Sequence, residues 1–182
     1  TDLIGDYQTE NIRTVMTAVD VLSPTIFSLD KNKVVDALAR VKKLTGLMGR
    51  WDIISQNPLV IADVAHNEDG INKLLHQLQV EHADKNLHFI FGFVADKDID
   101  KIMQLFPKNA SYYFSQAHIP RALAANELKE QAIVYGLFGS VFDDVNDALL
   151  AARQNAKSED AIIICGSFFL LAELHYYKEL SR

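Results

Sequence analysis

Polar side chains that could bind a nucleotide or a small substrate follow three stretches typical of buried strands. The first group is Asp63-Val64-Ala65-His66-Asn67. An acid at the end of a parallel strand can accept hydrogen bonds from ribose hydroxyls, and a histidine three residues later can donate to a phosphate or a substrate. The alternative is structural, in which Asp63 caps nearby backbone and Asn67 is the N-cap of the next helix.

The helix expected after Asn67 begins with two acids, Glu68 and Asp69. Helix N-termini attract phosphate because their backbone N–H groups carry partial positive charge, and two carboxylates already occupy that position here. If this loop binds a nucleotide, we therefore expect it to hold the sugar rather than the phosphates.

Lys97, Ser167 and Arg50 are further candidates. Lys97 lies between two acids after the next expected strand, where a lysine can neutralise a carboxylate substrate; alternatively Asp98 caps a helix and Lys97 points to solvent. Gly166-Ser167 offers close backbone approach, a hydroxyl and an N–H, or it is a plain strand-to-helix turn with Ser167 as N-cap. Arg50 could reach a phosphate or stack on a base, although solvation is the default for a single arginine.

Several classes of site are excluded by the sequence. It contains no Walker-type phosphate loop, its histidines show no metal-ligand spacing, and no nucleophile elbow is present. Cys165, the only cysteine, excludes an internal disulfide and is expected to pack as a small apolar side chain. A formal net charge of −6 gives no electrostatic basis for binding nucleic acid.

The elements that must position these residues fall into two parts. Residues 1–45 are expected to be helical, because apolar side chains recur at helical spacing in 11–19 and 30–44, with a break at Ser23-Pro24. From residue 51 onward strands and helices alternate. Strands are expected at 51–55, 59–62, 87–94, 110–114 and 161–165, with short ones at 133–135 and 140–142. Helices are expected after Asn67, over 98–105, from Pro120, from Asp143 or Asp144 to about 156, and over 168–177.

This alternation predicts an α/β fold, namely a Rossmann-like three-layer domain with a mostly parallel sheet flanked by helices, preceded by a short helical segment. A length of 182 residues suits one domain, or one domain plus a remnant of another. No apolar run approaches the ~20 residues of a membrane span, and no signal peptide opens the chain. We therefore expect a cytoplasmic protein without membrane or nucleic-acid partners. Thr1 in place of Met indicates a fragment or a processed chain.

Six segments in order carry a resemblance to a known family. They are Leu3 to Asn11 with the pattern Leu-x-Gly-x-x-Gln-x-x-Asn, Gly49-Arg50, Asp63 to Asn67, Asp96-Lys97-Asp98, Pro120-Arg121-Ala122 and Gly166-Ser167-Phe168. Together they resemble the C-terminal portion of the bifunctional folylpolyglutamate synthase/dihydrofolate synthase family of the Mur ligase superfamily. Val64 and Glu68 depart from the glycine and proline usual in the family. The resemblance implies that residues 1–45 are a helical remnant of the central ATPase domain with its linker, and that 46–182 are the C-terminal glutamate ligase domain.

The resemblance also implies a reaction, that of an ATP-dependent, amide-forming ligase. In this family ATP and Mg²⁺ convert a carboxylate of dihydropteroate, or of a folate's terminal glutamate, to an acyl phosphate that the amine of L-glutamate attacks. Phosphorylation supplies the leaving group that a carboxylate lacks, and cations stabilise the developing charge. The choice between dihydrofolate and polyglutamate products stays open, because the family's folate pocket belongs to its N-terminal domain.

Carried over by residue, Asn11, Arg50 and Asp63 would contact ATP, with Asn11 near the adenine, Arg50 near the phosphates and Asp63 on the ribose. His66 would lie beside the nucleotide as the candidate catalytic residue. Lys97 and Ser167 would hold the carboxylates of the incoming glutamate, by wider analogy with Mur ligases. No residue of this chain is assigned to the metal, which the family holds mainly through its N-terminal domain. The family's phosphate loop and most of its folate pocket belong to that domain too, so we expect this chain to be inactive alone. We also expect a monomer.

Two other interpretations stay open. The chain could be the C-terminal domain of a peptidoglycan-precursor Mur ligase, which differs in its acceptor; the segments at 3–11 and 96–98 favour the folate branch. It could instead be a non-catalytic, flavodoxin-like binding module, although two helices before the sheet fit a remnant of a preceding domain better.

Overall fold

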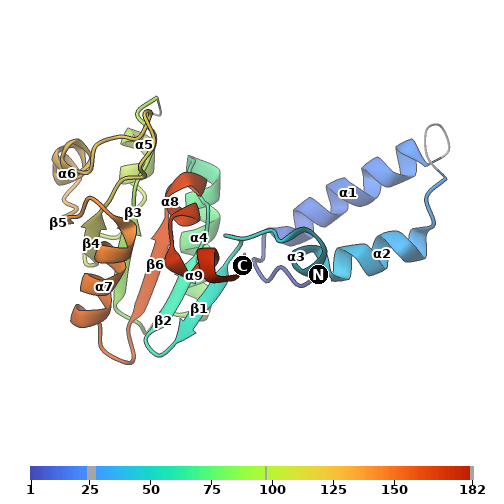
Figure 1. Ribbon diagram of the computed structural model, residues 1–182, viewed down its shortest axis with the longest axis horizontal. Helices are drawn as coiled ribbons and strands as arrows, with labels where there is room; N and C mark the ends of the chain where they lie inside the picture. Colours follow the sequence, from blue (N-terminus) through green and yellow to red (C-terminus); the bar gives the residue numbers. More distant parts are fainter. Residues whose placement is uncertain (24–27, 97, 181–182) are drawn as a thin grey trace. The chain divides into compact units, whose positions relative to one another are not determined.

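The structure is a computed structural model that describes residues 1–23, 28–96 and 98–180. It divides into two compact units, Thr1–Trp51 and Asp52–Arg182 (Figure 1). The domain boundary expected between residues 45 and 46 stays a prediction. Within the described ranges, no helix combines the length and the apolar character needed to cross a bilayer.

The first unit is helical, as expected, and contains α1 (Gln8–Leu22), α2 (Lys31–Ala39) and α3 (Val41–Thr45). The carboxylate of Asp2 accepts the backbone N–H groups of Lys42 and Lys43 at 3.0 and 3.1 Å. It thereby satisfies donors at the start of α3 that have no partner inside the helix, and it ties the segment before α1 to α3.

The helix expected over 30–44 is in fact two helices. Arg40 separates α2 from α3 because its backbone leaves the helical region, with φ −129° and ψ 31°. Apolar periodicity alone does not report such a break, because the side-chain pattern continues across it. The break expected at Ser23-Pro24 is described only as far as Ser23, the residue that caps the end of α1; Pro24 lies outside the described residues.

The second unit is built on a six-stranded sheet in the order β1-β2-β6-β3-β4-β5. The strands are β1 (Asp52–Gln56), β2 (Leu59–Ala62), β3 (Leu87–Phe91), β4 (Ser111–Phe114), β5 (Gly139–Val141) and β6 (Ala161–Cys165). Only the β1–β2 pair is antiparallel; all other neighbouring pairs are parallel. The predicted α/β fold with a mostly parallel sheet is confirmed.

Helices cover both faces of this sheet. They are α4 (Glu68–Glu81), α5 (Asp100–Met103), α6 (Ala125–Val134), α7 (Val145–Asn155), α8 (Phe168–Ala172) and α9 (His175–Leu180). Figure 1 shows α7 in front of the sheet and α4 behind it. α7 packs on β3 and β4, α6 on β4 and β5, and α8 on β6. The predicted three-layer arrangement is therefore present.

The core lies in the central strands, where every residue of β2 and β6 is buried, as their continuous apolar runs predict. An aromatic cluster fills one side, with the Phe91 ring 5.0 Å from Phe106 and 5.5 Å from Phe114. Because β2, β6, β3, β4 and β5 run parallel to one another, their carboxyl ends meet at one edge.

Three expectations for this unit are wrong. The helix expected over 168–177 is two helices, α8 and α9, separated at Glu173 and Leu174. Residues 133–135, expected as a strand, form the end of α6 and its cap; Ile133 and Val134 are exposed, so their apolar character does not reflect burial in the sheet. The helix expected from Pro120 begins at Ala125, because Ala122 first pairs with Val94 in an isolated antiparallel bridge.

Candidate functional site

Three of the predicted site loops meet at the carboxyl edge of the sheet. Backbone hydrogen bonds join the loop after β2 to β6 and its following loop: Asp63 N–H donates to the Ile164 carbonyl at 3.0 Å, and Gly166 N–H to the Ala65 carbonyl at 2.8 Å. The end of β4 is joined to β3 by Ser115 N–H donating to Phe91. This is the edge at which open α/β sheets bind their ligands.

Asp63 and His66 are both held by backbone groups of their own loop. Asp63 is 3% exposed, and its Oδ1 accepts the Ala65 N–H at 2.8 Å. Nδ1 of His66 lies 2.8 Å from the Val64 carbonyl, which can only accept. That bond therefore places a proton on Nδ1. The predicted N-cap role of Asn67 is confirmed, since its Oδ1 accepts the Gly70 N–H at 2.8 Å.

Gly166 and Ser167 make a tight turn into α8. Gly166 has φ +103°, and a Cβ there would lie 2.7 Å from the Gly92 carbonyl oxygen, so only glycine fits. Ser167 is buried, and its Oγ accepts the Phe169 N–H at 3.1 Å. The structural role foreseen for Ser167 as an N-cap is confirmed, and the hydroxyl keeps its own hydrogen as a donor.

A small cavity of about 210 Å³ opens at this edge. Loops after four strands line it, with His66, Val94, Arg121, Gly166, Ser167, Phe168 and Phe169. Pockets for drug-sized ligands are typically about 300–1,000 Å³, so this one suits a molecule the size of an amino acid. The structure thus brings together two residues proposed from the sequence, His66 and Ser167.

Arg121 lines this cavity, although the sequence predicted no role for it. Its guanidinium carbon lies 5.1 Å from the centroid of the Phe169 ring. Within the ranges that the structure describes, no carboxylate lies at ion-pair distance from it. The sequence contained one indication of its importance, because Pro120-Arg121-Ala122 resembles a family segment, but that resemblance gave it no chemical role. The fold places this arginine in the same cavity as Ser167.

The remaining predicted residues are described separately from this cavity. Asn11 and Arg50 belong to the first unit, where Asn11 Nδ2 donates to Gln8 Oε1 at 3.0 Å and Arg50 Nη1 to the Gly49 carbonyl at 3.3 Å. Lys97 lies outside the described residues. Its neighbour Asp98 accepts the Asp100 N–H at 3.3 Å, in the manner of the capping alternative. The ligand roles of these three candidates stay predictions.

The described residues do not make a metal site or a thiol nucleophile. No group of three His, Cys, Asp or Glu side chains gathers in those ranges to hold a metal ion. These ranges therefore supply no complete metal-binding cluster of their own, and we derive no step through a metal here. Complete burial raises the pKa of the Cys165 thiol far above its ordinary value, so this side chain stays protonated and packs in the core.

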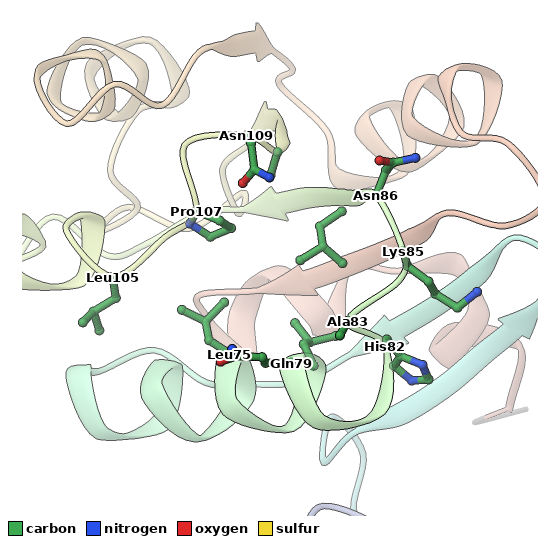
Figure 2. Close-up of a pocket in the computed structure, with 12 residues that line it drawn as sticks. Leu75, Gln79, His82, Ala83, Lys85, Asn86, Leu105, Pro107 and Asn109 are labelled. Atoms are coloured by element: carbon green, nitrogen blue, oxygen red, sulfur yellow. The ribbon is translucent and has the colours of Figure 1, made fainter.

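A second, larger cavity of about 460 Å³ lies at the opposite edge of the sheet (Figure 2). It is bounded by the C-terminal half of α4, the start of β3 and the segment before β4; Leu75, Leu105 and Pro107 lie around it. We place the functional site in the smaller cavity despite this difference in size, because an uncompensated arginine, a histidine and a hydroxyl converge there at the carboxyl ends of the strands.

The chain is similar to known proteins over most of its length. Residues 49–168 match the family model described as Mur ligase, glutamate ligase domain. The dihydrofolate synthase/folylpolyglutamate synthase of Escherichia coli is 30% identical over 159 residues, which cover 87% of this chain and 36% of that protein. The chain thus spans about a third of the length of this relative.

Two solved structures share the fold of this chain. The bifunctional folylpolyglutamate synthase/dihydrofolate synthase with Mn, AMPPNP and L-glutamate bound is 30% identical and superposes with a TM-score of 0.65, covering 75% of this chain and 32% of that one. A folylpolyglutamate synthase of Mycobacterium tuberculosis, complexed with ADP, is 22% identical with a TM-score of 0.72 over 97% of this chain and 40% of its own. At that identity it shows a shared fold alone.

Proposed function

The chain belongs to the Mur ligase family, to which its glutamate ligase domain assigns it, and on this premise we propose that it is the amino-acid-binding part of an ATP-dependent ligase. The ligase forms an amide between L-glutamate and a carboxylate of dihydropteroate or of a folate. This proposal follows the names of the relatives, one of which was solved with a nucleotide, a metal and L-glutamate.

The chemistry has two steps. A carboxylate oxygen of the acceptor attacks the γ-phosphorus of ATP, giving an acyl phosphate and ADP. The amine of L-glutamate then attacks the acyl carbon, loses a proton, and expels inorganic phosphate as the amide forms. The second step requires a neutral amine held against the acyl phosphate, and holding it is the task of the domain that binds glutamate.

The position of Arg121 in the small cavity is the observation that supports the proposal. Its guanidinium lies at a small cavity with the Ser167 hydroxyl and His66, and no carboxylate of the described residues neutralises it. Guanidinium groups bind carboxylates by paired N–H···O bonds. We therefore assign one glutamate carboxylate to Arg121 with Ser167, and keep Lys97 as a candidate for the other.

The nucleotide side of the proposal rests on family resemblance and on the strand-end position of Asp63. We assign the ribose hydroxyls to Asp63, the adenine to Asn11 and the phosphates to Arg50, with His66 as the candidate catalytic residue beside the nucleotide. Replacing Asp63 by Ala in a full-length enzyme should weaken nucleotide binding; unchanged affinity would remove the ribose assignment. Mg²⁺ is assigned to parts of the full enzyme other than the described residues, and we expect a cytoplasmic monomer.

Calorimetric titration of the chain with L-glutamate tests the proposal. We expect saturable binding that falls roughly ten- to hundredfold in Arg121→Ala, since a hydrogen-bonded charge contact is lost. Arg153→Ala, which removes an exposed arginine of α7, is the matched control and should leave the affinity unchanged.

The same titration separates the two branches of the family. Tighter binding of meso-2,6-diaminopimelate than of L-glutamate would favour a peptidoglycan-precursor ligase instead. Absence of saturable binding of either amino acid would favour a non-catalytic module.

A further inference from the structure

The loop between β4 and α6, residues 115–124, is attached to α8 and its C-terminal cap at two points. Arg121 lies over the Phe169 ring, 5.1 Å from its centroid. His118 meets Glu173 twice: its backbone N–H donates to Oε1 at 2.6 Å, and its Nδ1 lies 2.7 Å from Oε2. One carboxylate therefore holds both the backbone and the ring of the same residue.

The spacing of these residues relates the Arg121–Phe169 contact to the His118–Glu173 contact. Phe169 lies in the first turn of α8 and Glu173, four residues later, is its C-cap with helical backbone angles, so both lie on the same face. His118 and Arg121 are three apart in the loop, which therefore runs along this face. The two contacts therefore lie next to each other, with His118 on Glu173 and the guanidinium of Arg121 over Phe169.

The anchor itself is held by a third element. Asn146, in the first turn of α7, donates from Nδ2 to the Glu173 carbonyl at 3.1 Å and accepts the His175 N–H at 2.9 Å. Its own backbone N–H donates to Asp144 at 2.6 Å. The Glu173 backbone is thus fixed to a helix that packs on the sheet, so that the carboxylate is a rigid point of attachment.

The other side of the loop is fixed to the segment after β3. Ala95 N–H donates to the Arg121 carbonyl and Leu123 N–H to the Phe93 carbonyl, both at 2.9 Å, around the bridge between Val94 and Ala122. The Arg121 backbone is therefore fixed on one side, while among the described residues the Phe169 ring is the contact that orients its long, exposed side chain.

We propose that Phe169 and the His118–Glu173 pair are positioning residues that hold Arg121 in the orientation in which its guanidinium receives a carboxylate of the substrate amino acid. The proposal rests on the glutamate-binding function assigned to this cavity. An arginine that is oriented before binding loses less conformational freedom when a ligand arrives, so the same contact gives higher affinity.

The pair also gives the site a dependence on pH. The hydrogen bond to Glu173 and its charge raise the pKa of His118, and Asp144 and Asp143 at the start of α7 add to the rise; Arg121 is the cation on its own loop. Because the protonated imidazole binds the carboxylate, the contact is complete below the ordinary histidine pKa of about 6.5. It weakens as pH rises through the raised value.

Nuclear magnetic resonance of the 182-residue chain tests the proposal. The Nε–Hε signal of Arg121 should be shifted upfield by the Phe169 ring, should move to the position of a solvated arginine in Phe169→Leu, and should stay shifted in Phe169→Tyr. Affinity for L-glutamate should fall roughly two- to fivefold in Phe169→Leu, the loss expected for an exposed cation–π contact. Phe138→Leu, at an exposed phenylalanine elsewhere, is the matched control.

Glu173→Gln tests the second contact. The His118 ring should then titrate closer to its ordinary pKa, and glutamate affinity should lose the part of its pH dependence that wild type shows across that range. Glu130→Gln, an exposed glutamate of α6, should behave as wild type.

The outcomes separate this proposal from the function on which it rests. If Phe169→Leu leaves both the Arg121 signal and the affinity of wild type, Phe169 does not position the arginine. If Glu173→Gln leaves the His118 titration and the pH profile of affinity unchanged, the pair has no such role. A wild-type chain that binds no L-glutamate contradicts the proposed function, while the arginine signal and the histidine titration still report on positioning.

Discussion

Gly166 is the position at which the structure predicts the sharpest effect of a single methyl group. Two costs arise on Gly166→Ala. A non-glycine residue at φ +103° is strained by about 1–3 kcal/mol. The new Cβ would lie 2.7 Å from the Gly92 carbonyl oxygen and 3.2 Å from the Phe93 ring, which adds about 1–3 kcal/mol of overpacking. Alanine also lowers the conformational entropy of the unfolded chain, which offsets about 0.4–1 kcal/mol of this cost. We therefore expect the free energy of unfolding to fall by about 2–5 kcal/mol.

Gly136→Ala is the matched control for the strain alone. Gly136 has φ +78°, and a Cβ there meets only the flexible Lys108 side chain, at 3.6 Å. Left-handed backbone costs about 1–2 kcal/mol, and the same entropic return leaves about 1 kcal/mol. Urea unfolding measures both variants. With m near 2 kcal/mol/M, the midpoint should fall by about 1–2.5 M for Gly166→Ala and by about 0.5 M for Gly136→Ala. Equal shifts would refute the close approach of the two loops at the site.

The remaining predictions concern caps, acid stability and turnover. Asn67→Ala should lower the unfolding free energy by about 1 kcal/mol in urea titrations, because the Gly70 N–H loses its acceptor; no loss would contradict the observed cap. The Lys157 N–H and then the Asn86 amide lower the pKa of Asp160 below its ordinary 3.8, so its stabilisation is present above pH 3.8 and lost as pH falls through the lower value. Asp160→Asn should therefore be less stable at neutral pH and show a shallower acid transition; an unchanged acid transition would argue against this network. A coupled phosphate-release assay of the chain with ATP, glutamate and dihydropteroate should show no turnover, and turnover would overturn the expectation that it is inactive alone.

Local signals predicted the parts of the fold that depend on neighbouring residues. The N-caps Asn67, Ser167 and Asp144 each accept the expected backbone N–H, because capping involves only two or three consecutive residues. The buried runs 59–62 and 161–165 are strands for a similar reason, since continuous apolar residues rich in Val and Ile suit a strand covered on both faces.

Features that depend on tertiary contacts were not predicted. The helix expected over 168–177 is two helices, α8 and α9, separated at Glu173 and Leu174, where Asn146 of α7 takes the backbone bonds. The role of Arg121 depends on pairing between two loops more than twenty residues apart in sequence, and no local pattern reports such a pairing.

The central claim is that the carboxyl edge of the sheet, and not the larger cavity at the opposite edge, receives the amino acid. Amide chemical-shift mapping of the ¹⁵N-labelled chain during titration with L-glutamate tests it most directly. We predict that saturable shifts gather at His66, Arg121 and Ser167 and spare Leu75 and Leu105. Saturable shifts at Leu75 and Leu105 without change at Arg121 and Ser167 would contradict the account.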